Sequence, residues 1–238
     1  MPLPIFIDDS ASAQMLDDDT KYPETDGIHR ADNTLHNEWV ITFKGGLDAM
    51  FADHENVFVA GNLFWYPVEG NLKIASAPDA MVVVGRPKGH RRSYRQWAEE
   101  NIAPQFVVEI LSHSNTVDEM LEKLHWYEQY GVQEHYLYNP DTNYCAGWLR
   151  KDEVLHKIPQ MNGFRSPLLG ITFLLNATTL TILRPDGKTF EGYMDAVRRA
   201  DAEEQLREEA QMRARLAQEQ NQRFAAKLRE LGINPDEI

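Results

Sequence analysis

A single carboxylate interrupts one of the most apolar stretches of this chain. In QFVVEILSHS (105–114), Glu109 stands among residues that favour a buried β-strand. An isolated carboxylate in an apolar interior is costly enough that its pKa shifts and the group becomes neutral. The sequence therefore predicts a compensating partner for Glu109. The alternative is an edge strand on which Glu109 faces water.

A second acid, Asp79, stands at the start of the apolar run AMVVV (80–84). Two acids carried by neighbouring strands can converge on one point. Mg²⁺ is often bound by one or two carboxylates together with water and substrate phosphate. Taken alone, Asp79 also fits an ordinary turn residue after Pro78.

The segment TVDEMLEKLHWYEQYG (116–131) predicts an amphipathic helix that ends at a C′ glycine. Its apolar stripe, within about 40° in helical projection, consists of Met120, Leu124, Tyr127 and Gly131. Lys123 lies beside this stripe, so its ammonium can reach Glu109 or extend to solvent. Thr116 and Glu119 fit a capping box, and an i,i+4 pair of Glu119 with Lys123 is the competing interpretation. Asp, Glu and Lys together are the set that metal-dependent phosphodiester hydrolysis needs.

These side chains must be positioned by an α/β domain over 33–192. The pattern predicts a helix over 33–51, weakened at Gly45-Gly46, and two strands, NVFVAG and NLFWYPV, joined by a tight Gly61-Asn62 turn. Further strands are expected at 78–85, 105–111, 134–140 and, as shorter segments, near 143–150, 153–158, 171–175 and 180–191. The order strand, helix, strand over 105–140 predicts a βαβ unit with a right-handed crossover.

The two ends of the chain have a different composition. Residues 1–32 are polar and acidic and predict a poorly ordered arm. From Tyr193 to Leu231 there is no Gly or Pro, which predicts a long helix within a tail over 193–238. Its apolar positions hold no single heptad register, so a self-pairing coiled coil, and with it a homodimer, and a solvated tail both remain open.

Composition limits the classes of function. The chain has 238 residues, a formal net charge of −13 and one cysteine, Cys145. A chain with one cysteine forms no internal disulfide, and together with the absence of a recognisable signal or membrane-spanning run this predicts a cytoplasmic protein. The acidic balance excludes a protein that grips nucleic acid over its whole surface, because phosphate contacts require cations. Any contact with DNA must be local or transient.

Three segments, APDAMVVVGRPKG, FVVEILSHSN and EKLHWYEQYGVQEHYLYNP, resemble the Uma family of prokaryotic restriction endonucleases, a branch of the PD-(D/E)XK nuclease superfamily. The resemblance covers roughly residues 20–190. It implies the restriction-endonuclease-like αβββαβ core, in which helices flank a mixed sheet, here followed by a long C-terminal helix. It also implies dependence on Mg²⁺ or Mn²⁺ and DNA as substrate.

The resemblance assigns roles to particular residues. Asp79 matches the aspartate of the motif and Glu109 its second acid, and the backbone carbonyl of Ile110 is implied as a further metal ligand. The usual superfamily lysine would fall two residues after Glu109, where this chain has a leucine. Lys123 instead matches the lysine that the family carries on the following helix. An additional acid from the first helix often completes such sites, and Glu38, with His36 nearby, is a poor match to it.

A basic segment, RPKGHRRSYR (86–95), separates the two acidic strands. Its cations, predicted to contact nucleic acid, are Arg86, Lys88, Arg91, Arg92 and Arg95. Because the segment connects the two strands, we expect its ends to lie near the acids. Tyr94 and Trp97 could offer faces on which bases stack. The alternative is a solvated loop that balances an acidic surface.

Three hypotheses follow. The first is a metal-dependent endonuclease in which Asp79 and Glu109 bind the ion and Lys123 orients the attacking water. The second is a catalytically degenerate nuclease fold that serves as a binding or assembly module through its C-terminal helix. The third is a Mg²⁺-dependent hydrolase of small phosphoesters.

Overall fold

The computed structural model describes residues 22–23, 33–112 and 115–232, and the chain divides into two compact units, Met1–Gly192 and Tyr193–Ile238. The arm expected over 1–32 lies outside the described residues except at Tyr22 and Pro23. Tyr22 is buried and packs against Tyr66 and Trp97. This part of the N-terminal segment is therefore attached to the first unit.

A six-stranded sheet in the order β1-β3-β5-β6-β7-β8 forms the centre of the first unit. Its strands are β1 (Val57–Ala60), β3 (Ala80–Val84), β5 (Phe106–Ile110), β6 (Glu134–Asn139), β7 (Tyr144–Lys151) and β8 (Val154–Lys157). β5 and β6 are parallel, and every other neighbouring pair in this sheet is antiparallel. The sheet is therefore mixed, as expected.

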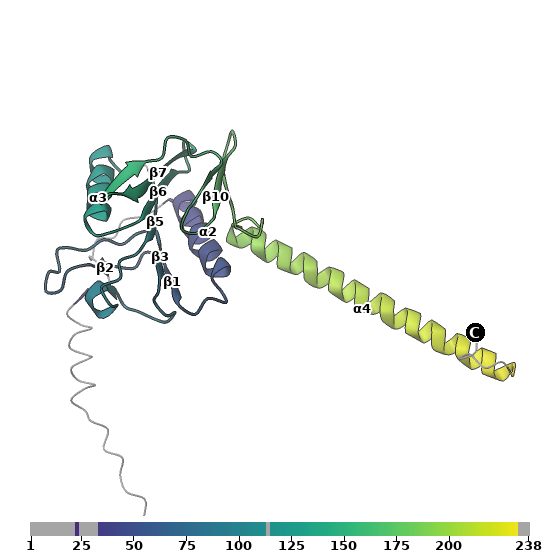
Figure 1. Cartoon of the computed structure of the whole chain (residues 1–238). Helices are drawn as coiled ribbons and strands as arrows, with labels where there is room; N and C mark the ends of the chain where they lie inside the picture. The colour runs from purple at the N-terminus through teal and green to yellow at the C-terminus, as the bar shows by residue number, and fades with distance from the viewer. Residues whose placement is uncertain (1–21, 24–32, 113–114, 233–238) are drawn as a thin grey trace, which may run out of the picture. The chain divides into compact units, whose positions relative to one another are not determined.

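Two helices cover opposite faces of this sheet (Figure 1). Helix α2 (Thr34–Met50) buries Val40, Phe43 and Leu47 against one face. Helix α3 (Val117–Gln129) buries Tyr127 against the other. The predicted capping box is confirmed, because Thr116 and Glu119 each accept a hydrogen bond from the other's backbone N–H.

Smaller elements complete the unit. β2 (Trp65–Tyr66) pairs in parallel with β4 (Tyr94–Arg95), which leads into a short 3-10 helix, η1 (Gln96–Ala98). A three-stranded sheet packs on the same face as α2 and consists of β9 (Phe164–Arg165), β10 (Thr172–Leu175) and β11 (Leu180–Leu183).

The element order α2, β1, β3, β5, α3, β6 is the predicted αβββαβ core, with β2 and β4 inserted. The strands expected on either side of Gly61-Asn62 do not pair with each other. β1 pairs with β3 instead, and β2 belongs to the small sheet with β4. Asn62 does adopt a positive φ of 50°, but its N–H donates to the Pro78 carbonyl, so the turn leads the chain away from β1.

Helix α2 continues through Gly45-Gly46, where the sequence predicted a weak point. A Cβ atom at Gly46 would overlap the ring of Phe190. The glycine is therefore explained by close packing, and Phe190, near the end of the first unit, is held against α2.

The second unit is one helix, α4 (Tyr193–Glu230), close to the predicted span. Ion pairs one turn apart, such as Arg199 with Glu203 and Arg215 with Glu219, lie along its surface. Large apolar side chains are exposed on it, among them Leu206, Met212, Leu216 and Phe224, and Leu231, directly after its end, is exposed as well. Within the described part of the chain, no helix is long and apolar enough to cross a membrane.

Candidate functional site

Strand register brings the two predicted acids together. β3 and β5 are antiparallel, and Ala80 lies opposite Val108. One further step along each chain places Asp79 opposite Glu109. Because side chains alternate between the faces of a strand, Glu109 belongs with Val107 to the face that α3 covers, whereas Asp79 lies directly before the first residue of β3. Asp79 is 9% exposed and Glu109 is 3% exposed, so both require partners.

Helix α3 supplies two partners for Glu109. Lys123 Nζ lies 2.6 Å from Glu109 Oε2, and the Tyr127 hydroxyl donates a hydrogen bond to Oε1. Lys123 and Tyr127 are one helical turn apart and therefore share a face of α3. The Oγ of Ser76 lies 3.0 Å from the Tyr127 hydroxyl oxygen. A polar chain thus runs from Ser76 through Tyr127 to the buried carboxylate.

The electrostatics of the site follow from burial. Burial raises the pKa of Glu109 above its ordinary value, the charge of Lys123 opposes this rise, and the charge of Asp79 adds to it. Burial and the neighbouring Glu109 also raise the pKa of Tyr127 well above its ordinary value, so Tyr127 remains a hydrogen-bond donor at neutral pH. The Lys123 side chain is 36% exposed, compared with 3% for Glu109. The ammonium is therefore accessible from solvent.

Asp79 has its own contacts. The backbone N–H of Ile110 donates to Asp79 Oδ2 at 2.7 Å, and His36 Nε2 lies 3.6 Å from the same oxygen. His36 is buried, whereas Glu38, two residues later, is exposed and lies about 200° around helix α2. The structure therefore brings His36 to the acids and does not bring Glu38 there.

The donor set can be compared with the divalent ion that the resemblance implies. In the described part of the chain, no three His, Cys, Asp or Glu side chains form a group able to hold a metal ion. Asp79 and Glu109 nevertheless offer carboxylate oxygens, which are hard ligands, from positions that lie opposite each other on neighbouring segments of the chain. Mg²⁺ commonly uses one or two carboxylates and retains several waters. The two carboxylates therefore fit a Mg²⁺ ion. The backbone carbonyl oxygen of Ile110 is the further ligand that the resemblance implies.

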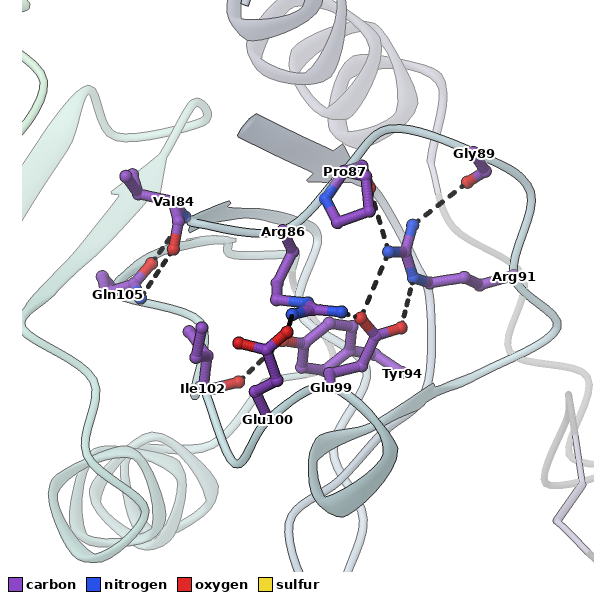
Figure 2. Close-up of polar contacts among 10 residues, drawn as sticks. All are labelled: Val84, Arg86, Pro87, Gly89, Arg91, Tyr94, Glu99, Glu100, Ile102 and Gln105. Atoms are coloured by element: carbon purple, nitrogen blue, oxygen red, sulfur yellow. Dashed lines mark hydrogen bonds and ion pairs between the residues drawn. The ribbon is translucent and has the colours of Figure 1, made fainter. Parts of the chain in front are cut away.

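Two of the five predicted DNA-binding cations form ion pairs within the protein (Figure 2). Arg86 Nε and Arg91 Nε lie 2.8 and 2.6 Å from the two carboxylate oxygens of Glu99. Arg86 also pairs with Glu100 at 2.6 Å, and the Arg91 guanidinium lies 4.0 Å from the centre of the Phe58 ring. Burial alone would raise the pKa of Glu99, but the hydrogen bonds from Arg91 and Arg86 outweigh it and hold this pKa below its ordinary value.

The other three cations differ in their surroundings. Lys88 Nζ donates to the backbone carbonyls of Phe51 and Ala52. Arg92 and Arg95 line a hollow of about 270 Å³ on the surface of the loop. Arg91 and Glu99 line the same hollow, and the Arg95 guanidinium lies 6.0 Å from the centre of the Tyr22 ring.

The basic segment does not begin and end beside the acids, as its place between the two strands led us to expect. The chain leaves β3 after Val84, and the Gln105 side chain closes the connection by bonding the Val84 backbone N–H and carbonyl (Figure 2). That end of β3 is about 17 Å from Asp79 at the ~3.4 Å rise per residue of an antiparallel strand. The expectation was wrong because β3 and β5 run antiparallel. Tyr94 is fully buried as well, so it offers no open face for stacking.

Sequence reasoning missed two members of the polar chain. Tyr127 was assigned only to the apolar stripe of the helix, although its position one turn after Lys123 could have indicated a second partner for Glu109. Ser76 gave no comparable signal. It reaches Tyr127 because a bridge between Ser76 and Trp65 fixes the segment that precedes Asp79.

An αβββαβ core with one acid directly before β3, a second acid on β5 and a lysine on α3 defines a mixed α/β protein of the nuclease-like class. The family model described as Uma2, putative restriction endonuclease, matches residues 20–176, which is more than half of the chain. The chain belongs to this family. The resemblance identified from the sequence is therefore confirmed.

Comparison with solved structures shows a similarity to a putative nuclease belonging to DUF820 from Anabaena variabilis. The two share 15% sequence identity over 64% of this chain and 87% of that chain, with a TM-score of 0.44. No curated protein matches the sequence.

Proposed function

We propose that this protein hydrolyses phosphodiester bonds in DNA with the help of a divalent ion, Mg²⁺ or Mn²⁺. The observation that carries the proposal is the meeting of Asp79, Glu109 and Lys123 from three different elements. Two buried acids and one accessible ammonium are a set suited to this chemistry. The acids can hold a cation, and the ammonium can stabilise charge that develops on a phosphate.

In this proposal Asp79 and Glu109 hold the ion, and the carbonyl of Ile110 assists. When bound, such an ion supplies Lewis-acid stabilisation of the phosphate and lowers the pKa of water. Lys123 orients the attacking water and stabilises charge on the phosphoryl oxygens. Tyr127 holds Glu109 in place, as groups that contact metal ligands commonly do.

The acidic charge of the chain favours a transient contact with DNA. A net charge of −13 opposes approach to a polyanion, and Arg86 and Arg91 are already paired with Glu99. Affinity for phosphate must therefore come from few cations, which include Lys123, Arg92 and Arg95.

The first test is the effect of Mg²⁺ on thermal stability and on supercoiled plasmid. An ion that binds only the folded protein raises the melting temperature. Asp79→Asn keeps an oxygen that can accept the hydrogen bond from Ile110, so the metal-free fold should remain intact or become slightly more stable. The Mg²⁺ shift and plasmid cleavage should both be lost. Asp53→Asn, at an exposed acid, is the matched control and should retain both.

Lys123→Ala should behave differently. It should retain part of the Mg²⁺ shift, lose cleavage, and lower the melting temperature without metal, because Glu109 loses its ionic partner. Lys157→Ala, at an exposed lysine, is the control. If the wild-type protein shows no shift with millimolar Mg²⁺ or Mn²⁺ and Asp79→Asn is indistinguishable from it, the proposed metal site is wrong. Cleavage of a small phosphoester but not of plasmid would favour the small-molecule hydrolase.

A second candidate function is a binding or assembly module. The observation that favours it is the set of large apolar side chains exposed on α4, such as Leu206 and Phe224. Self-association through α4 would give a homodimer. If the oligomeric state depends on α4 and no metal shift is seen, this function is favoured over the nuclease.

A further inference from the structure

A pocket of about 520 Å³ opens beside the proposed catalytic residues. Lys123, which pairs with Glu109, lines it from α3, and Ser76, which contacts Tyr127, lines it from the segment before Asp79. The pocket is thus continuous with both arms of the polar network around Glu109. If a phosphate binds at Lys123, a chemical group attached to that phosphate would lie in this pocket.

Half of the residues that line the pocket are apolar or aromatic, and the other half are polar or charged. The aromatic rings are those of Phe64 and Trp126, and the small or aliphatic side chains are those of Ala75, Ala77 and Met120. Phe64 and Trp126 are both partly exposed, which leaves part of each side chain accessible to a ligand. Aromatic side chains beside polar groups that fix the orientation of a ligand are common in pockets that bind small organic groups.

The charges around the pocket disfavour double-stranded DNA. Among the described lining residues, Lys123 carries the single positive charge, whereas Glu119 and Glu122 carry negative charges. A duplex presents two closely spaced rows of phosphates, and its affinity depends on cations that replace counterions. Arg86 and Arg91, two cations of the basic segment, pair with Glu99 near the opposite end of β3.

We infer that this pocket binds an unpaired nucleobase adjacent to the scissile phosphodiester, so that the substrate is single-stranded or has an extruded base. The inference rests on the proposed function, because it places the phosphate at Lys123. Stacking on aromatic side chains is a main source of affinity for unpaired bases and requires little positive charge. Phe64 is the simpler probe of it, since its ring contacts only that of Tyr66 among the described residues, whereas Trp126 packs against Trp65, Tyr127 and Tyr130.

The test measures binding without cleavage. Fluorescence anisotropy of a labelled twelve-nucleotide oligothymidine, in EDTA, is compared with that of the same strand in a duplex with oligoadenosine. We expect the full-length protein to bind the single strand at least about tenfold more tightly. Phe64→Leu should weaken this binding by about 5- to 100-fold, and Phe64→Tyr, which keeps the ring, should restore most of it.

A second variant protects the test against misfolding. Ala75→Leu fills the pocket from another lining position without removing a ring, and should weaken single-strand binding with little change in melting temperature. Equal or tighter binding of the duplex would overturn the inference, as would unchanged affinity in a folded Phe64→Leu protein. Failure of the proposed function is distinguishable, because it would appear as intact single-strand binding without Mg²⁺-dependent cleavage.

Discussion

At the scale of single residues, the position of Glu109 is explained by what surrounds it. A carboxylate that is 3% exposed is kept in an apolar strand by the ammonium of Lys123 and the phenol of Tyr127, beside a second acid, Asp79. The contact with Asp79 is repulsive without a cation. The site is therefore stabilised by its lysine and destabilised by its second acid, which is the balance expected of a site that binds a divalent ion.

Tyr127 provides a first prediction at this scale. Tyr127→Phe removes the donor to Glu109 Oε1 and the contact with Ser76 while preserving the ring. We expect cleavage to fall by about 10- to 100-fold and metal affinity to weaken. The cost in stability should be about 1 to 3 kcal/mol, because Glu109 loses a buried hydrogen bond. Metal titration and thermal melting of the variant measure the two effects. Unchanged metal affinity would show that the phenol is only a packing group.

His135 is a buried residue that the proposed chemistry does not use. It is 1% exposed and lies between the rings of Tyr127 and Trp148. Within the described residues, neither ring nitrogen has a hydrogen-bond partner. Burial and, to a smaller extent, the charge of Lys123 lower the pKa of His135 from 6.5 to about 3. The folded protein therefore holds this imidazole neutral, whereas the unfolded chain can protonate it.

This difference predicts how stability depends on pH. Because the unfolded state binds the proton and the folded state does not, stability must fall as the pH decreases from about 6.5 toward 3, and by about 2 kcal/mol at pH 5. His135→Phe removes both this loss and the unsatisfied nitrogens, so it should be more stable than wild type, increasingly so at acidic pH. The difference in melting temperature between His135→Phe and the wild type, measured from pH 5 to 7.5, tests this prediction. His156→Phe, at an exposed position, should show no such widening.

At the scale of elements, the connection between β3 and β5 is organised by Glu99. This carboxylate lies between two guanidinium groups, and its side chain is 13% exposed, like that of Arg86. Two of the basic residues of this connection, Arg86 and Arg91, therefore stabilise the connection itself. The adjacent Glu100 also pairs with Arg86, but its side chain is 76% exposed.

The two glutamates allow a matched comparison. Glu99→Gln should lower the free energy of unfolding by about 1 to 3 kcal/mol, because two partly buried arginines lose their shared charge partner. Glu100→Gln should cost less than about 1 kcal/mol, as exposed pairs do. Chemical denaturation distinguishes the two. Equal effects would mean that the Glu99 cluster is no stronger than a surface pair.

The elements that the sequence predicted well are those with a local signal. The apolar run at β5 and the periodicity and capping box of α3 specify both elements, and the place of Lys123 beside the stripe of α3 put it within reach of Glu109. Pairing between distant segments carries no such signal. The antiparallel pairing of β3 with β5, which separates Arg86 from Asp79, and the placement of Ser76 both depend on contacts across the sheet. His36 and Glu38 were distinguishable only once the buried face of α2 was known.

At the scale of the whole molecule, the two units differ in whether they have a buried core. The first has an apolar core on each face of its sheet, whereas no described residue of α4 is buried. We therefore expect a chain that ends at Gly192 to melt within a few degrees of the full-length protein, although its oligomeric state can change. Calorimetry and analytical ultracentrifugation measure the two quantities. Failure of the shortened chain to fold would contradict the prediction.

A slightly shorter chain provides the control. A protein that ends at Lys188 also loses Phe190, which is buried against α2 at Gly46. Removal of a buried phenylalanine side chain typically costs about 3 to 5 kcal/mol. The chain ending at Lys188 should therefore melt far below the one ending at Gly192, and similar melting temperatures would show that Phe190 contributes little.

The packing of Phe190 on Gly46 also has a mechanical consequence. The Phe190 ring is fixed to α2 just before the chain leaves the first unit. The Phe190 N–H also donates to the Ile182 carbonyl of β11, so tension applied to the C-terminal segment would load α2 and β11 before it reached the central sheet. The same helix holds His36 beside Asp79, so α2 is the element through which a pull on the tail would first be felt at the acids.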